Sequence, residues 1–160
     1  MPKKLSPRPA KTQKRLGLVL DLGTSIRLTI QWPGGSKACR THTVVLDNWI
    51  ANFQEALDVP HEKYLLKDFC GADFFRNKTG LTAETVYHQT QEGNIEGAEL
   101  FVEYGAHMGA LIANLEMIFQ PSCISITGPL AKTFGAWSHA MGKTRKNHLG
   151  KRPACKITIL

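Results

Sequence analysis

With 160 residues, of which 42% are apolar, the chain is long enough to bury one core and too short for two domains. Its formal net charge is +7, from 20 Lys and Arg against 13 Asp and Glu, which favours anionic partners. No apolar run is long enough to cross a bilayer, and the basic N-terminus lacks the apolar stretch of a secretion signal, so we expect a cytoplasmic protein that does not bind membranes.

The first 15 residues, MPKKLSPRPAKTQKR, combine repeated positive charge with proline and almost no apolar side chains. Such a segment cannot bury a core, so we expect a disordered tail over 1–15 and a single domain over 16–160. A second basic cluster lies between Lys143 and Arg152. Both clusters attract phosphate without selecting a base sequence, so the sequence supports only non-specific nucleic-acid binding, through the tail above all.

The four cysteines, Cys39, Cys70, Cys123 and Cys155, are far apart and form no C-x-x-C pair. Disulfide frameworks belong to small secreted chains, and zinc sites usually show closely spaced ligand pairs. None of the six histidines stands in an H-E-x-x-H motif. We therefore expect reduced thiols and no metal site.

Strand-forming sequence comes first in the predicted domain. Residues 16–22 and 26–32 are β-prone and flank a Gly-Thr-Ser turn, and PGGS at 33–36 forms a second turn. THTVVL at 41–46 is a third strand candidate. Three short consecutive strands with tight turns predict an antiparallel meander.

Helices follow these strands. Thr82 can cap a helix that Gly93 ends, and residues 95–119 repeat apolar side chains at helical spacing over a wide face. This pattern predicts a long and largely buried helix.

Four residues of this long helix carry specific expectations. Gly105 and Gly109 lie four positions apart, which indicates close packing against another element. Leu115 is expected in the core, beneath the next strand. Glu116 is expected on the polar face, where its removal would cost little.

The last third of the chain alternates between strands and helices. Pro121 ends the long helix, and CISIT at 123–127 is predicted to be a buried strand. A Gly-Pro pair then leads into a helix over 130–141, and a basic loop leads to a final strand, CKITIL, at 155–160. A meander followed by alternating helices and strands is the order of the ribonuclease-H-like, actin-like ATPase domain, so we predict an α/β domain of that class.

Residues 108–128, MGALIANLEMIFQPSCISITG, resemble the ROK family of sugar kinases and sugar-responsive repressors. In that family a helix with a Leu-Gly-x-x-Ile-Ala-Asn-Leu run leads through an Asn/Asp-Pro corner to a Val-Ile-Val-Ile-Gly-Gly-Gly strand. EGNIEGAELF at 92–101 is similar to the family's Gly-Asp-x-x-Ala segment, and LLKDFCGADFF at 65–75 to its Tyr-x-Ser-Gly-x-x-Leu helix. RPACKITIL at 152–160 is similar to the next strand, so the resemblance keeps its order from 18 to 160.

Within this resemblance, LVLDLGTSIRL at 18–28 matches either of two phosphate loops. Asp-x-Gly-Thr begins the first loop of such enzymes, and Leu-Gly-Thr-Gly is the second loop of this family. The family's Ser-Gly helix follows the second loop by some tens of residues, and the separation of Gly23 from Gly71 fits that distance. The chain therefore resembles the C-terminal half of such a kinase, and Asp21 is not expected to be the aspartate of the first loop.

The resemblance implies ATP and Mg²⁺ as cofactors, and a nucleotide and a sugar as ligands. Gly23, Thr24 and Ser25 match the phosphate loop, where glycine lets the backbone approach an anion closely; a simple β-turn is the other interpretation. The adenosine-binding glycines of the family correspond to Thr127, Gly128 and Pro129, although two of the three are replaced.

Among the sugar-binding residues of the family, only the histidine has a counterpart here, His42. The family's Glu-x-Gly-His contacts sugar hydroxyls, and its counterpart here is Cys-Arg-Thr-His at 39–42. A structural or exposed histidine is the other interpretation of His42. The family's Cys-x-Cys-Gly-x-x-Gly-Cys zinc motif is absent, so no zinc is expected.

Sugar kinases of this type use an aspartate as general base. In the family this aspartate lies in an Asn-Asp-x-Asn stretch just before the second phosphate loop, and only the basic tail precedes Gly23 here. We therefore identify no catalytic residue, and we expect a truncated domain that does not phosphorylate glucose or an N-acetylhexosamine by itself. Two alternatives stay open: a relic of a ROK sugar-sensing repressor, and a non-catalytic subunit that a partner completes.

The family's fold places a helix after the last strand, and this sequence stops at Leu160 without one. The C-terminal helix is therefore expected to be missing. One face of the sheet near CKITIL should then carry an exposed apolar patch and edge, which predicts self-association.

Overall fold

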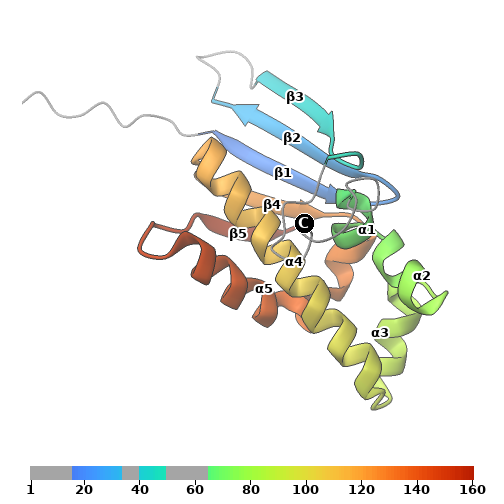
Figure 1. The fold of residues 1–160 in the computed structure, drawn as a ribbon. Helices are drawn as coiled ribbons and strands as arrows, with labels where there is room; N and C mark the ends of the chain where they lie inside the picture. The colour runs from blue at the N-terminus through green and yellow to red at the C-terminus, as the bar shows by residue number, and fades with distance from the viewer. Residues whose placement is uncertain (1–15, 34–39, 50–64) are drawn as a thin grey trace, which may run out of the picture.

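The computed structural model describes residues 16–33, 40–49 and 65–160. In these residues a mixed five-stranded sheet lies against a layer of helices (Figure 1). The predicted tail over 1–15, Cys39 and most of the PGGS turn lie outside the described residues.

The sheet is built around its first strand. β1 (Gly17–Leu22), β2 (Ile26–Trp32) and β3 (Arg40–Val45) are consecutive, and each is antiparallel to the next. β4 (Cys123–Thr127) pairs in parallel with the other side of β1, and β5 (Lys156–Ile159) pairs in parallel with β4. The resulting order is β3-β2-β1-β4-β5, so the carboxyl ends of β1 and β4 share one edge of the sheet.

Three short helices follow β3: α1 (Leu66–Cys70), α2 (Asp73–Thr79) and α3 (Ala83–Gln91). The long helix α4 (Ile95–Phe119) has 25 residues, as the apolar spacing predicted. The predicted cap of α3 is confirmed, because the Thr82 hydroxyl accepts the N–H of Thr85 at 3.2 Å. Asn94 caps α4 in the same way, through the N–H of Gly97 at 2.8 Å.

The segment after β4 differs from the prediction. The 3-10 helix η3 (Pro129–Thr133) comes first, and α5 (Phe134–Leu149) then runs eight residues beyond the predicted end at 141. The basic stretch expected to be a loop is helical because buried Met141 and Leu149 continue the apolar contacts of α5 across it. Lys143 and Lys146 are exposed on this part of α5, whereas Arg145 is turned toward α4 and pairs with Glu116.

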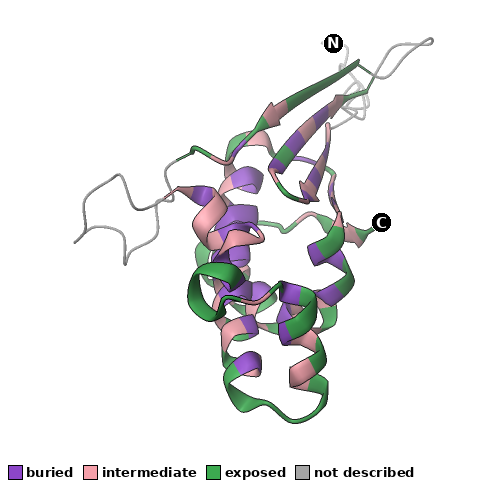
Figure 2. Ribbon diagram, turned by 90° about the vertical axis from the view of Figure 1, so that its right-hand side faces the viewer, coloured by how far each residue is buried: buried purple, intermediate pink, exposed green. Residues whose placement is uncertain are grey.

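The core lies between one face of the sheet and α4. Along β1 and β4 the buried side chains alternate with partly exposed ones, and the buried set comprises Leu18, Leu20, Leu22, Ile124 and Ile126. Figure 2 shows the same alternation on the strands and the concentration of buried positions along α4. This periodicity of two is typical of a sheet that packs a single apolar face.

The opposite face of the sheet is mainly polar. One row across it, in register, consists of Thr43, Thr29, Val19, Ser125 and Thr158. Near the final strand the exposed apolar side chains are Ile159 and Leu160, at the edge of the sheet. The expected apolar patch is therefore confined to that edge, and self-association stays a prediction.

The helices α4 and α5 pack at close range through two glycines, as predicted. A Cβ on Gly109 would lie 2.5 Å from the Met141 carbonyl oxygen, and one on Gly105 would overlap the carbonyl oxygen of Trp137. Real Cβ atoms do not approach backbone this closely. The two glycines therefore set the distance between the helices.

Replacing Gly109 by alanine is expected to lower the free energy of unfolding by about 1–3 kcal/mol, because the methyl group forces the two helices apart. Gly142→Ala on α5 is the matched control, since nothing lies within 4 Å of its Cβ position. The control should raise the free energy of unfolding by up to about 1 kcal/mol through helix propensity. Urea denaturation followed by circular dichroism measures both, and equal effects would refute the close packing.

Candidate functional site

Two turns lie side by side at the carboxyl ends of β1 and β4. After β1 comes the turn 23–25, and after β4 comes Gly128, which leads into η3. The parallel register pairs Asp21 with Thr127, which brings these turns together. The chain continues from β1 into β2, which pairs with one side of β1, whereas β4 pairs with the other side. Open α/β sheets bind ligands at such a switch point, where the connections of two neighbouring strands diverge. The structure thus places the predicted phosphate and adenosine segments next to each other.

Gly128 is confined by its neighbours. Its φ of +94° is one that residues with side chains rarely adopt. A Cβ there would lie 2.6 Å from Asp21 Oδ1 and 2.8 Å from the carbonyl carbon of Leu22. Of the three predicted adenosine-binding positions, this one requires glycine for a reason visible in the structure.

A cavity of about 400 Å³ opens beside these turns. Three of the predicted site residues, Gly23, Thr24 and Pro129, line it. The other walls come from the end of β1 and from α2, α3 and η3. They include apolar Leu22, Ala83, Tyr87 and Leu130, cationic Arg76 and Lys132, and acidic Asp73 and Glu84. This volume and mixture of side chains are typical of a pocket for a small organic ligand.

Neighbouring contacts hold the walls in place. Tyr87 packs edge-on against Phe101 of α4, with ring centroids 6.0 Å apart. In η3, the Thr133 hydroxyl donates to the carbonyl oxygen of Leu130 at 2.9 Å and accepts the indole N–H of Trp137 at 3.2 Å. At the turn itself, the Asp47 carboxylate accepts the N–H of Ile26 at 2.6 Å. The cavity is therefore built on ordered elements.

The other predicted site residues lie apart from the cavity lining. Ser25, Thr127 and Gly128 are not among its described wall residues. His42 is exposed on β3 and pairs with Ile30, four residues along β2 from Ile26. At about 3.3 Å per residue this places it roughly 13 Å from the turn. Sugar binding by His42 stays a prediction.

Sequence reasoning missed several residues of this region: Asp21, Asp47, Arg76, Tyr87 and Lys132. Asp21 could have been singled out from the sequence, because an acidic residue two positions before a glycine turn lies close to that turn. The cavity-lining side chains of α2 and α3 carried no signal, because they follow the turn by more than 45 residues and only the fold brings them to it.

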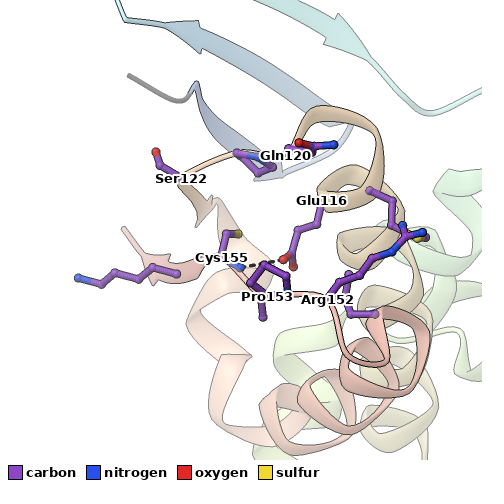
Figure 3. A pocket seen from close by; sticks show the side chains of 11 residues that line it. Glu116, Gln120, Ser122, Arg152, Pro153 and Cys155 are labelled. Carbon is purple, nitrogen blue, oxygen red and sulfur yellow. Dashed lines mark hydrogen bonds between the residues drawn. The ribbon is translucent and has the colours of Figure 1, made fainter. Parts of the chain in front are cut away.

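A larger cavity, of about 620 Å³, lies at the opposite end of the sheet, where β4 and β5 begin (Figure 3). Glu116 in its wall is only 6% exposed. One Glu116 oxygen accepts Arg145 Nε at 2.5 Å, and the other accepts the N–H of Cys155 at 2.8 Å. The expectation that Glu116 lies on the polar face is therefore wrong, because that flank of α4 faces α5 and the segment before β5.

This buried ion pair also affects the neighbouring thiol. Burial and the negative charge of Glu116 raise the pKa of Cys155 to about 11, against the opposing charge of Arg145. Arg145 additionally donates to the carbonyl oxygen of Cys155 at 2.5 Å. The cluster joins α4, α5 and the segment before β5, and its polar atoms bond to one another, so we assign it a structural role.

Two kinds of feature are absent from the described residues. No group of three or more His, Cys, Asp and Glu side chains is arranged there to hold a metal ion. No helix in the described ranges combines the length and apolarity that a bilayer crossing requires.

Neither a family model nor a curated protein sequence matches the chain, whereas solved structures do. A ROK hexokinase from Thermus thermophilus superposes with a TM-score of 0.69 at 14% identity, over 91% of this chain and 52% of that one. A ROK family glucokinase from Streptomyces griseus, in complex with glucose and AMPPNP, gives 0.66 at 14% identity, over 94% and 57%. A ROK family transcriptional regulator, a homologue of the E. coli Mlc protein, gives 0.68 at 12% identity, over 90% and 41%.

These comparisons establish the fold. The resemblance to the ROK family is confirmed at that level, and the mixed α/β sheet is the one found in these sugar kinases. The chain spans about half the length of the ROK hexokinase and glucokinase that it matches.

Proposed function

We propose that this chain is the nucleotide-binding, C-terminal half of a ROK-type sugar kinase, or of a protein derived from one, and that it binds ATP. The observation that carries the proposal is the pairing of β1 with β4, which sets two glycine turns and a cavity of about 400 Å³ at one switch point. The match to a glucokinase solved with AMPPNP supports the choice of nucleotide.

In this proposal the cavity holds the adenosine and the turn holds the phosphates. Gly23 and Thr24 offer a backbone N–H and a hydroxyl to an anion. Tyr87 and Leu130 supply apolar surface for a base, and Lys132 supplies a cation at the same wall. Mg²⁺ would accompany the phosphates.

Charge reversal at the cavity tests nucleotide binding. Lys132→Glu is expected to weaken ATP binding about tenfold, because it replaces an attraction to phosphate by a repulsion near the surface. Lys143→Glu on α5 changes the net charge equally and does not line the cavity, so it should keep the wild-type affinity. Isothermal titration with ATP and MgCl₂ measures both, and equal losses would assign the effect to overall charge alone.

The catalytic contribution of this half is expected to be incomplete. The chain spans 52% of the ROK hexokinase and 57% of the glucokinase that it matches, so we propose that the general base and the sugar-binding surface belong to a completing domain. Phosphorylation of glucose or an N-acetylhexosamine would be the activity of the complete protein, in the cytoplasm. A coupled assay with a sugar panel tests this, since turnover in the usual kinase range of about 1–100 s⁻¹ by this chain would contradict it.

A second candidate is a sugar-sensing regulator without catalysis. The ROK transcriptional regulator superposes as well as the kinases do, with a TM-score of 0.68. The reading frame upstream of Met1 separates the two candidates. Asp-x-Gly-Gly-Thr and Asn-Asp segments there would support a kinase, and a helix-turn-helix would support a regulator.

A further inference from the structure

One carboxylate lies between the two turns of the candidate site. Asp21 Oδ1 is 3.5 Å from the position that a Cβ on Gly23 would take, and 2.6 Å from the corresponding position on Gly128. The alternation of β1 explains this placement. Leu20 and Leu22 are buried in the core, so the intervening Asp21 points to the opposite face of the sheet. It lies close to both turns but is not among the described residues that line the cavity.

The Asp21 carboxylate has no partner within the described part of the protein. No hydrogen bond or ion pair engages it there, although Arg27 stands directly opposite on β2. A carboxylate that served only to anchor the hairpin would pair with this arginine, since opposite charges across strands attract. The structure instead leaves it available to a ligand at the turns.

This carboxylate conflicts with a bare phosphate at the same place. A phosphate held by Gly23 and Thr24 would face Asp21 across a few ångströms, and two like charges at that separation repel. A divalent cation between them would reverse the effect, because both anions would then be attracted to it. The site is therefore suited to a phosphate that arrives with a cation.

The donor set fits magnesium in this role. Mg²⁺ in nucleotide sites is usually held through one or two carboxylates together with substrate phosphates and water, rather than by a cage of protein side chains. A single aspartate beside the phosphate turn meets this requirement.

We propose that Asp21 makes the site select the magnesium complex of the nucleotide over the free nucleotide. The inference rests on the proposed nucleotide binding and adds to it a metal-dependent discrimination by a named residue. With Mg²⁺ bound, Asp21 would hold the phosphates through the cation. Without Mg²⁺, the Asp21 carboxylate would repel the phosphates.

The test compares binding of a fluorescent ADP to the full chain in MgCl₂ and in EDTA, by anisotropy. Wild-type protein should bind at least about tenfold more tightly with Mg²⁺. In the near-isosteric Asp21→Asn variant this ratio should fall to about threefold or less, through weaker binding in MgCl₂ and tighter binding in EDTA. Asp21→Ser serves as a second variant, and thermal unfolding verifies that each is folded.

Arg27→Gln is the matched control. It alters the charge opposite Asp21 on β2 and leaves the carboxylate in place, so it should keep the ratio of tenfold or more. An unchanged ratio in Asp21→Asn, or a loss of the ratio in Arg27→Gln as well, would overturn the inference. Equal wild-type binding in MgCl₂ and EDTA would overturn it while leaving nucleotide binding intact. No binding in either condition would overturn both proposals.

Discussion

Replacing Glu116 by alanine is expected to lower the free energy of unfolding by about 3–5 kcal/mol, the usual cost of removing one partner from a buried ion pair. The Glu116 and Arg145 side chains are only 4% and 13% exposed. The substitution leaves the guanidinium without its counter-charge and the N–H of Cys155 without its acceptor at 2.8 Å. Urea denaturation followed by circular dichroism measures the loss.

Two variants separate this effect from a general loss of charge on α4. Glu99→Ala removes a carboxylate from an exposed position of the same helix, and it should change the free energy of unfolding by about 0.5 kcal/mol or less. Glu116→Gln keeps an oxygen that can accept the N–H of Cys155 while removing the charge, so it should fall between the two. A stability of Glu116→Ala within the error of wild type would contradict the buried pair.

Leu115→Ala is expected to destabilise the domain by about 2–5 kcal/mol, because it removes buried methyl groups and leaves a cavity. Leu115 is 2% exposed and belongs to the core beneath the sheet. Ile118→Ala on the same helix is the control, since Ile118 is 67% exposed. Its effect should stay near 0.5 kcal/mol. Comparable midpoints of urea unfolding for the two variants would refute the orientation of α4.

The two experiments together test which side of α4 faces the protein. From apolar spacing alone, Leu115 belongs to the core and Glu116 does not. The structure agrees about Leu115 and disagrees about Glu116, because α5 and the segment before β5 cover a second flank of the helix. The sequence predicts that a charged residue on this flank is exposed. It does not show that Glu116 is buried, because its partner Arg145 is distant in the chain.

Local pattern was sufficient for the strands and for α3 and α4. β-prone runs beside turn residues located β1 and β4, a continuous helical period located α4, and the hydroxyl of Thr82 marked the start of α3. The pair Gly105 and Gly109 indicated a close helix contact before its partner was known. Each of these features depends on residues within a few positions of one another, and sequence shows such neighbours directly.

The end of α5 and the candidate site were decided by tertiary structure. From sequence, the basic stretch after Met141 is predicted to be a loop. In the structure it is helical, and buried Leu149 continues the contacts of that helix. The sequence named the turn at Gly23 and the corner at Gly128, but only the parallel pairing of β1 with β4 places Asp21 between them. The cavity walls come from α2 and α3, far from both turns in sequence. Sequence by itself determined the strands, α3, α4 and their order, because these follow from local side-chain patterns. The end of α5 and the contents of the site depend on long-range contacts, which only the folded chain defines.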